Sequence, residues 1–375
     1  MSEEISPIDR YVLDKEADKV GGVVTFLFGE QGAGKTLAMV NKAKIDFEED
    51  RIVIWRGQES CQWILLAAQN LPITLWMDKN INSYDFYTTG DLRTDIETRK
   101  INITEAKDID VKIKEFKEPS EIIEHPETDR VNVYYIPGDK SDHIKDRYYA
   151  ISKTTDLWKA MNRRTWGNHI CYLDDEAPDI LSPETQQPLY PLINFVMPKE
   201  MGNFRKNNIS NMNNAHHKSE IFYKFHDIKS NSDIYFRGSK ISSRNNEIDQ
   251  NAVNKLDRGQ FIVPGWERGK FKMPYMPHET ISWMRDEPEF KLKLNIEASI
   301  PDIRPEKDVE QKLKDSPIDE RILEDIVDVS EAADILDTTN RTVRRRISKG
   351  KIPAILAQNK YLMSRSNIEN SLKQD

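Results

Sequence analysis

The chain has 375 residues, of which 31% are charged and 38% are hydrophobic, and its formal net charge is −8 at pH 7. A chain of this length can build one large core together with a smaller module. The negative net charge argues against a protein coated in nucleic acid, although it says little about a local patch. The two cysteines, Cys61 and Cys171, lie in apolar stretches, so we expect reduced core residues rather than a disulfide or a zinc site.

The sequence predicts neither a secretion signal nor a membrane span. Its first residues, MSEEISPIDRYVLDKEADK, are charged where a signal peptide needs an apolar core. The longest uncharged run, residues 60–77, is interrupted by glutamine, asparagine and proline, which favours a buried helix followed by a buried strand. We therefore expect a soluble, cytoplasmic protein without an integral membrane segment, located in the host cytoplasm if a virus or plasmid encodes it.

Apolar strands alternate with helices from about residue 20 to residue 80. VVTFLF (23–28), RIVIW (51–55) and ITLWM (73–77) are predicted strands, and helices are predicted after the first strand and over residues 63–69. This alternation predicts an α/β fold with a mainly parallel sheet that is covered on both faces. Residues 80–130 are dense in charge and weakly periodic, which indicates an irregular segment or a small inserted subdomain.

Further apolar runs continue the sheet beyond residue 130. The predicted strands are VNVYYIP (131–137), HICYLDDE (169–176), NISNMNNAH (208–216), SDIYFRG (232–238) and GQFIVPGW (259–266). A helix is predicted over residues 148–162. Residues 285–320 then turn to charge and proline with few bulky apolar side chains, which is typical of a linker. We therefore expect a first domain over residues 1–284 and a second domain over residues 321–375.

Residues 29–36, GEQGAGKT, fit the phosphate-binding pattern G-x-x-x-x-G-K-[ST] between a predicted strand and a predicted helix. The glycines let the backbone turn so that its N–H groups converge on a phosphate. Lys35 supplies a point charge for the β- and γ-phosphate oxygens, Thr36 a hydroxyl for Mg²⁺, and the helix its positive end. The pattern predicts a site for ATP and Mg²⁺ formed by Gly29, Glu30, Gln31, Gly32, Ala33, Gly34, Lys35 and Thr36.

A second motif, ICYLDDEA (170–177), has three acids directly after an apolar run. A P-loop site needs a carboxylate for the metal at the end of an adjacent strand. In the preferred interpretation, Asp175 is this metal-side aspartate and Glu176 polarises the attacking water. Side chains alternate between the faces of a strand, so three adjacent acids cannot all face one site in the same way. An alternative register, shifted by one residue, makes Asp174 and Asp175 the pair. A glutamate beside the metal aspartate favours water as the acceptor, so hydrolysis is predicted rather than a kinase reaction.

These motifs resemble those of the additional-strand P-loop ATPases of the FtsK and HerA group, which includes chromosome translocases, conjugative coupling proteins and viral packaging ATPases. The resemblance spans about residues 20–280 and includes FRKNNISNMNNAHHKSEIFYKFHDIKSNSDIYF (204–236). It implies a RecA-like P-loop NTPase core in which His216 senses the γ-phosphate and Arg205 acts on the site of a neighbouring subunit. A homo-oligomeric ring such as a hexamer follows, since the family completes its site with that arginine.

The last fifty residues predict a separate module. SEAADIL (330–336) predicts a helix, the next residues a turn in which Thr339 or Asn340 caps a second helix, and KIPAILAQNKYLM (351–363) a two-stranded wing. Residues 338–375 contain nine Lys or Arg against two Asp or Glu, so this piece carries about +7 within an acidic chain. Such a charge asymmetry is typical of a DNA-binding appendage.

The second helix of this module presents a basic face. On a helical wheel Val343 and Ile347 share one side and can pack on the first helix, whereas basic side chains fall on the opposite side and on both flanks. The block resembles a winged helix-turn-helix of the excisionase or MerR type, which implies double-stranded DNA as the partner. The predicted DNA-binding residues are Arg341, Arg344, Arg345, Arg346, Lys349, Asn359 and Lys360.

Together these motifs predict an ATP-hydrolysing motor that handles DNA, of the translocation or genome-packaging type. One alternative is a membrane-associated assembly or extrusion ATPase of the zonula-occludens-like type. The other is a nucleotide-switched DNA-binding regulator that turns over slowly. The lack of a predicted membrane helix and the presence of the winged module favour the motor over the extrusion ATPase.

Overall fold

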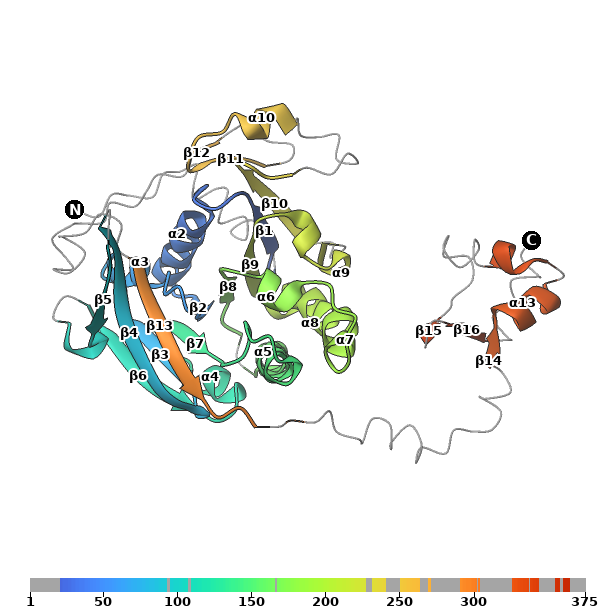
Figure 1. Cartoon of the computed structure of the whole chain (residues 1–375), viewed down its shortest axis with the longest axis horizontal. Helices are drawn as coiled ribbons and strands as arrows, with labels where there is room; N and C mark the ends of the chain where they lie inside the picture. Colours follow the sequence, from blue (N-terminus) through green and yellow to red (C-terminus); the bar gives the residue numbers. More distant parts are fainter. Residues whose placement is uncertain are drawn as a thin grey trace. The chain divides into compact units, whose positions relative to one another are not determined.

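The computed structural model describes residues 21–92, 95–106, 109–165, 167–226, 231–240, 250–263, 269–270, 291–301, 303, 326–336, 338–343, 355–357 and 360–364. The chain divides into two units, Met1–Ile303 and Arg304–Asp375, which are drawn in Figure 1. Each unit is described separately below.

Ten of the described strands form one sheet in the first unit. They are β1 (Val24–Phe28), β2 (Ile52–Arg56), β3 (Ile73–Asp78), β6 (Val111–Phe116), β7 (Val131–Tyr135), β8 (Ile170–Asp174), β9 (Ile209–Ala215), β10 (Asn231–Phe236), β11 (Gln260–Ile262) and β12 (Gly269–Lys270). Their order across the sheet is β12-β11-β10-β1-β9-β8-β2-β7-β3-β6. All neighbours from β10 to β6 are parallel, and β11 and β12 extend the sheet antiparallel. The predicted α/β fold with a mainly parallel sheet is confirmed.

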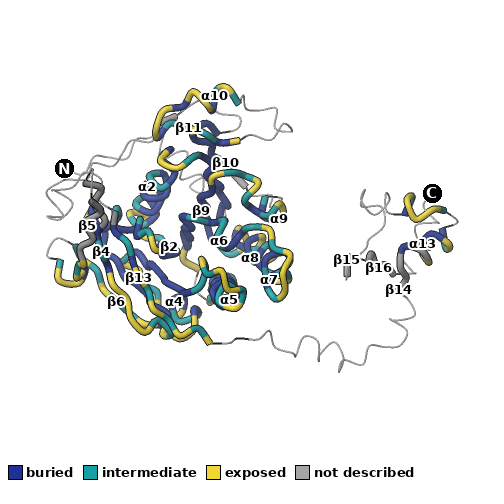
Figure 2. Tube along the Cα trace, in the orientation of Figure 1, coloured by how far each residue is buried: buried dark blue, intermediate teal, exposed yellow. Residues whose placement is uncertain are grey.

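Both faces of this sheet are covered, because every residue of its central strands β1, β2, β7, β8 and β9 is buried. One face packs against α5 (Ile144–Arg163) and α8 (Met197–Phe204), and the other against α2 (Lys35–Glu48) and α3 (Ile64–Ala67). Figure 2 shows the buried residues concentrated along the sheet between these helices. Both cysteines are buried as thiols, as predicted.

Short helices connect the remaining strands of this unit. They are η2 (Ile103–Glu105), α4 (Ser120–Glu124), α6 (Pro178–Leu181), α7 (Leu189–Pro191), η3 (Leu192–Val196), η4 (Arg205–Asn207), η5 (Lys218–Glu220), α9 (Tyr223–His226) and α10 (Gln250–Asn254). The segment from α6 to η4 joins β8 to β9 and covers the face that also carries α5.

A three-stranded antiparallel sheet covers part of the face that carries α2. Its order is β13-β4-β5, formed by β4 (Ile81–Leu92), β5 (Asp95–Ile101) and β13 (Lys291–Ala298). The predicted linker is therefore wrong over β13, where Leu292 and Leu294 are buried in the core. Its sequence, KLKLNIEA, alternates apolar and polar residues because only one face of the strand is buried.

The strand order brings the two predicted motifs to one edge. β1 leads into the P-loop, β8 ends in the acids, and β9 lies between them. Because these three strands are parallel, their carboxyl ends meet at the same edge of the sheet.

The second unit contains α13 (Val329–Ile335), helical residues 340–343, and a sheet in the order β14-β16-β15, within the parts described there. Its strands are β14 (Ile326–Asp328), β15 (Ile355–Ala357) and β16 (Lys360–Ser364), paired antiparallel. Thr339, rather than Asn340, caps the second helical segment, since its Oγ1 accepts from the Thr342 N–H at 3.3 Å. Val343 is buried, as the helical wheel predicts.

His169, just before β8, gives the first unit a pH-dependent stability. Its ring nitrogens contact Asn208 Oδ1 at 3.1 Å and Ser210 Oγ at 2.8 Å. Burial, helped by the positive charge of Arg51, lowers the pKa of His169 to about 4. In the unfolded chain this pKa lies near about 6.5, so stabilisation by the neutral ring is present above that pH and is lost as the pH falls toward 4.

Between pH 7 and pH 5, the free energy of unfolding of the wild type should therefore fall by about 1–2 kcal/mol more than that of His169→Gln. Urea denaturation followed by tryptophan fluorescence at both pH values measures this difference. His125→Gln, at an exposed histidine after α4, is the matched control and should behave as the wild type. Equal pH slopes in wild type and His169→Gln would contradict the assignment.

Candidate nucleotide site

The P-loop between β1 and α2 depends on its glycines. Gly32 and Gly34 have φ angles of 76° and 107°, which glycine adopts without strain. Gly34 directly precedes α2, and a Cβ atom on it would lie 2.9 Å from the Cα of Gly259. Any larger residue at this position would have to displace the backbone around Gly259, so the loop conformation requires glycine there.

Residues that follow β10 in the chain contact the P-loop and support it. The carboxylate of Glu30 pairs with Arg237, and the Glu30 N–H donates to the Arg237 carbonyl at 2.9 Å. The Ala33 carbonyl accepts from the Gly259 N–H at 2.8 Å. Ala33 is buried, whereas Gln31 is exposed. Contacts with Arg237 and Gly259 thus stabilise the P-loop, whereas Gln31 at its tip is exposed to solvent.

Lys35 is buried against the loop that it follows. Its Nζ donates to the carbonyls of Gly29 at 2.6 Å and Glu30 at 2.9 Å. Burial lowers the pKa of Lys35 to about 8, although the charge of Asp175 opposes this shift. A phosphate would offer this ammonium group a charged partner in place of neutral carbonyls, so the site favours an anion.

Asp175 lies directly beside the first turn of α2. The Thr36 hydroxyl donates to Asp175 Oδ1 at 3.1 Å, and the Asn214 amide of β9 donates to the same oxygen at 2.5 Å. Asp175 is 4% exposed, and burial raises its pKa to about 7. The structure therefore brings together the hydroxyl and the carboxylate that the sequence assigns to the metal.

These two groups fit Mg²⁺. Hydroxyl and carboxylate oxygens are ligands that this ion takes, and it usually keeps several waters and binds substrate phosphates as well. Within the described part of the chain, no group of three or more His, Cys, Asp or Glu could hold a metal by itself. A metal at Thr36 and Asp175 would thus take its remaining ligands from water and the nucleotide.

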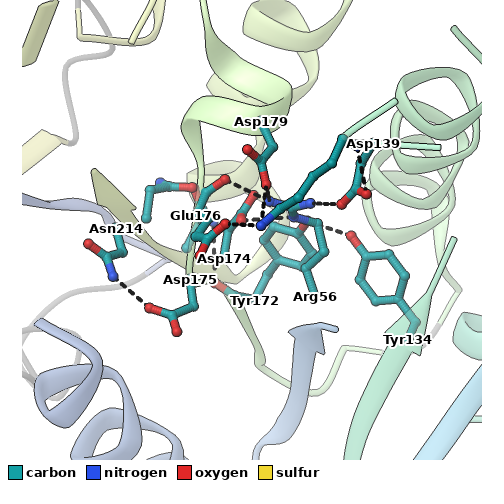
Figure 3. A network of polar contacts seen from close by, with 12 residues as sticks. Arg56, Tyr134, Asp139, Tyr172, Asp174, Asp175, Glu176, Asp179 and Asn214 are labelled. Carbon is teal, nitrogen blue, oxygen red and sulfur yellow. Dashed lines mark hydrogen bonds and ion pairs between the residues drawn. The ribbon is translucent and has the colours of Figure 1, made fainter. Parts of the chain in front are cut away.

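Asp174 points away from this pair. It is fully buried, and its Oδ1 accepts from Arg56 Nε at 2.8 Å. Figure 3 shows Asp174 turned toward Arg56 and Asp175 turned toward Asn214. The alternative register, with Asp174 and Asp175 sharing the metal site, is not formed.

Glu176 follows on a turn and is partly exposed. Its Oε2 lies 2.5 Å from Lys140 Nζ, and its backbone carbonyl accepts from Arg56 Nη2 at 2.7 Å. The carboxylate proposed to polarise water is therefore held by an ion pair in this structure. Neither Arg56 nor Lys140 was predicted as a site residue.

Arg56 is the centre of the polar network in Figure 3. Its side chain is 3% exposed and also pairs with Asp139 Oδ2 at 2.6 Å and Asp179 Oδ2 at 3.6 Å. The only sequence signal is an arginine at the end of an apolar strand, in RIVIWRG. Asn214 was missed as well, although the run of asparagines in NMNNA marks β9 as unusually polar.

His216 lies beside the first P-loop glycine. It directly follows β9, and its Nδ1 is 3.3 Å from the Gly29 carbonyl oxygen. The His216 carbonyl in turn accepts from the Gly29 N–H at 3.2 Å. The next residue, His217, instead forms a capping box with Glu220 around η5. The structure thus brings His216, and not His217, to the loop.

Arg205 lies at the opposite edge of the sheet. It is exposed in η4, before the start of β9, and its carbonyl accepts from the Gly22 N–H, before the start of β1, at 3.2 Å. The P-loop lies at the other ends of these strands. Arg205 is therefore not brought to the P-loop of its own chain.

The predicted DNA-binding residues belong to the second unit. Arg341 is exposed in helical residues 340–343, and Lys360 begins β16. The others lie outside the described residues: Arg344, Arg345, Arg346, Lys349 and Asn359. Among the described helices of the whole chain, none has the length and apolar character needed to cross a membrane.

Comparison with known proteins gives weak likenesses. No family model matches the sequence, and no curated protein matches it. The genome packaging NTPase B204 of Sulfolobus turreted icosahedral virus 2, in complex with AMP, is 11% identical over 64% of this chain and 92% of that chain, with a TM-score of 0.37. Its AMPPCP complex is 8% identical over 68% of this chain and 100% of that chain, with a TM-score of 0.35.

The N-terminal domain of the zonular occludens toxin from Neisseria meningitidis is 12% identical over 77% of this chain and 98% of that chain, with a TM-score of 0.24. Such low identities and TM-scores carry no functional conclusion. The function is therefore inferred from the residues of the site.

Proposed function

We propose that this chain is a Mg²⁺-dependent ATPase that acts on double-stranded DNA as a translocation or packaging motor. The observation that carries the proposal is the meeting of the P-loop, Asp175 and Glu176 at one edge of a parallel sheet. The 3.1 Å contact between Thr36 and Asp175 supports it most directly, because these residues come from motifs 139 positions apart.

In this proposal, Lys35 and the loop N–H groups bind the β- and γ-phosphates of ATP. Thr36 and Asp175 hold Mg²⁺, which offsets negative charge on the phosphate oxygens when it is bound. Glu176 orients a water and accepts its proton as the water oxygen attacks the γ-phosphorus. The bond between that phosphorus and the bridging oxygen breaks, and ADP and phosphate leave.

The remaining site residues act on the γ-phosphate in this proposal. His216, beside Gly29, senses whether that phosphate is present. Arg205 contributes to the site of the next chain in a homo-oligomeric ring such as a hexamer. This role agrees with its position, since it is exposed and remote from the P-loop of its own chain.

The second unit is the proposed DNA-binding module, a winged helix-turn-helix. Its buried Val343 and exposed Arg341 agree with a helix that packs through one side and presents the other. The wing is assigned to the β15–β16 hairpin, and the remaining contacts to the basic residues that follow Arg341. Each phosphate that the module neutralises should add about 0.9 to the slope of log affinity against log salt concentration.

ATP hydrolysis with and without duplex DNA, measured with Mg²⁺ and with EDTA, tests the proposal. We expect hydrolysis only with Mg²⁺, and stimulation by DNA in low salt. A chain that ends after Ile303 should keep basal hydrolysis and lose the stimulation, because it retains β13 and lacks the basic module. Failure to hydrolyse ATP would contradict the ATPase, whereas slow turnover with ATP-dependent DNA affinity would indicate a switched regulator.

A further inference from the structure

Building on the proposed ATPase function, we propose that Lys140 is a positioning residue that restrains Glu176, and that hydrolysis requires their ion pair to open. Lys140 lies in the loop between β7 and α5. Its Nζ is 2.5 Å from Glu176 Oε2, with side chains that are 40% and 42% exposed. Oε2 is thereby engaged by a cation, whereas a carboxylate that polarises water must accept a hydrogen bond from that water.

The loop that carries Lys140 is connected to the buried Arg56 through Asp139. One oxygen of Asp139 accepts from Arg56 Nη1 at 2.6 Å, and the other accepts from the Lys140 N–H at 2.9 Å. Arg56 itself is nearly inaccessible, with 3% of its side chain exposed. The backbone of Lys140 is therefore linked through Asp139 to Arg56 at the end of β2.

The same guanidinium also fixes the other partner of the pair. Arg56 Nη2 donates to the Glu176 carbonyl at 2.7 Å, and Arg56 Nε donates to Asp174 at 2.8 Å. Arg56, Asp139, Lys140 and Glu176 thus form a closed ring of contacts. The positions of both backbones are set by one buried side chain, so the ion pair is a built feature of the fold.

A second donor engages the same oxygen. In the amide orientation that satisfies its neighbours, the Gln58 nitrogen is 3.2 Å from Glu176 Oε2 and its oxygen accepts from Arg56 at 2.6 Å. Gln58 is neutral, so the charged contact with Lys140 is the stronger restraint. This half-exposed pair is readily opened, which makes it suitable for release during each turnover.

The test compares kcat and KM for ATP in full-length wild type, Lys140→Met, Lys140→Arg and Glu176→Gln. We expect Lys140→Met to raise kcat by about three- to fivefold with KM unchanged, since exposed ion pairs are weak and fivefold corresponds to about 1 kcal/mol. Lys140→Arg keeps the cation and should stay near the wild type. Lys159→Met removes a comparable pair with Asp156 on α5, outside the site, and should change neither constant.

A lower or unchanged kcat in Lys140→Met, or a change confined to KM, overturns the restraint. Equal acceleration by Lys140→Met and Lys159→Met overturns it too, because the effect would then be unspecific. If the wild type hydrolyses ATP and Glu176→Gln does not, these outcomes reject only the role of Lys140. If the wild type is inactive with Mg²⁺, the proposed ATPase function fails, and the restraint fails with it.

Discussion

Glu176→Gln should lower the rate of ATP hydrolysis by about 10²–10⁴-fold and leave ATP binding intact. Glutamine has nearly the same shape but cannot accept the proton of the attacking water. In the proposed site, Lys35 and the loop bind the phosphates, and Thr36 and Asp175 hold the metal. The substitution touches none of these residues. Single-turnover hydrolysis and equilibrium titration with a fluorescent ATP analogue separate the two effects.

The matched control for this prediction is Glu124→Gln, at an exposed glutamate on α4 away from the site. It should hydrolyse ATP at the wild-type rate. Loss of binding in Glu176→Gln would show that Glu176 contributes to the nucleotide pocket, and the assignment as the water-polarising group would then be wrong. Wild-type turnover in Glu176→Gln would shift that role to another acid.

Local sequence patterns predicted those parts of the site whose conformation is set by residues adjacent in the sequence. The turn at the P-loop is encoded by Gly32 and Gly34 themselves, and the strand before the acids by its apolar run. The carboxyl ends of parallel strands share one edge, so the meeting of the P-loop with the acids follows from the α/β pattern. This is why the sequence identified Thr36 and Asp175 as partners.

Contacts that depend on strand order were not predicted. Asn214 reaches Asp175 across 39 positions, and Arg56 reaches Asp174 across 118 positions. Both contacts exist because β8 lies between β9 and β2, which no local pattern specifies. The alternating sequence of β13 is a strand signal, but its partner β4 lies about 200 positions earlier, so the surrounding charge suggested a linker instead.

The proposed role of Arg205 depends on another chain. A resemblance to a family can assign the residue along the sequence, but its partner site belongs to a second subunit. The structure of one chain adds that Arg205 is exposed and lies at the edge opposite its own P-loop. That position agrees with the proposed action on a neighbouring site, because it keeps Arg205 away from the P-loop of its own chain.

Arg56→Met should destabilise the first unit by about 3–5 kcal/mol, because it leaves buried carboxylates without their cation. Asp174 is fully buried and would lose its partner at 2.8 Å, and Asp139 would lose the contact at 2.6 Å. Methionine fills similar volume but offers no hydrogen-bond donor. Urea denaturation followed by tryptophan fluorescence measures the loss, with Arg163→Met, at an exposed arginine ending α5, as the control within about 0.5 kcal/mol of the wild type.

The loss in Arg56→Met should shrink as the pH falls. Burial already raises the pKa of Asp174 and Asp179 above their ordinary values, with Arg56 opposing the shift, so removing Arg56 raises both further. An acid whose pKa is higher in the folded state than in the unfolded state destabilises the fold above that pKa and is relieved by protonation below it. The difference from wild type should thus be larger at pH 8 than at pH 5. A loss that does not vary with pH would mean that lost packing, rather than uncompensated charge, explains the destabilisation.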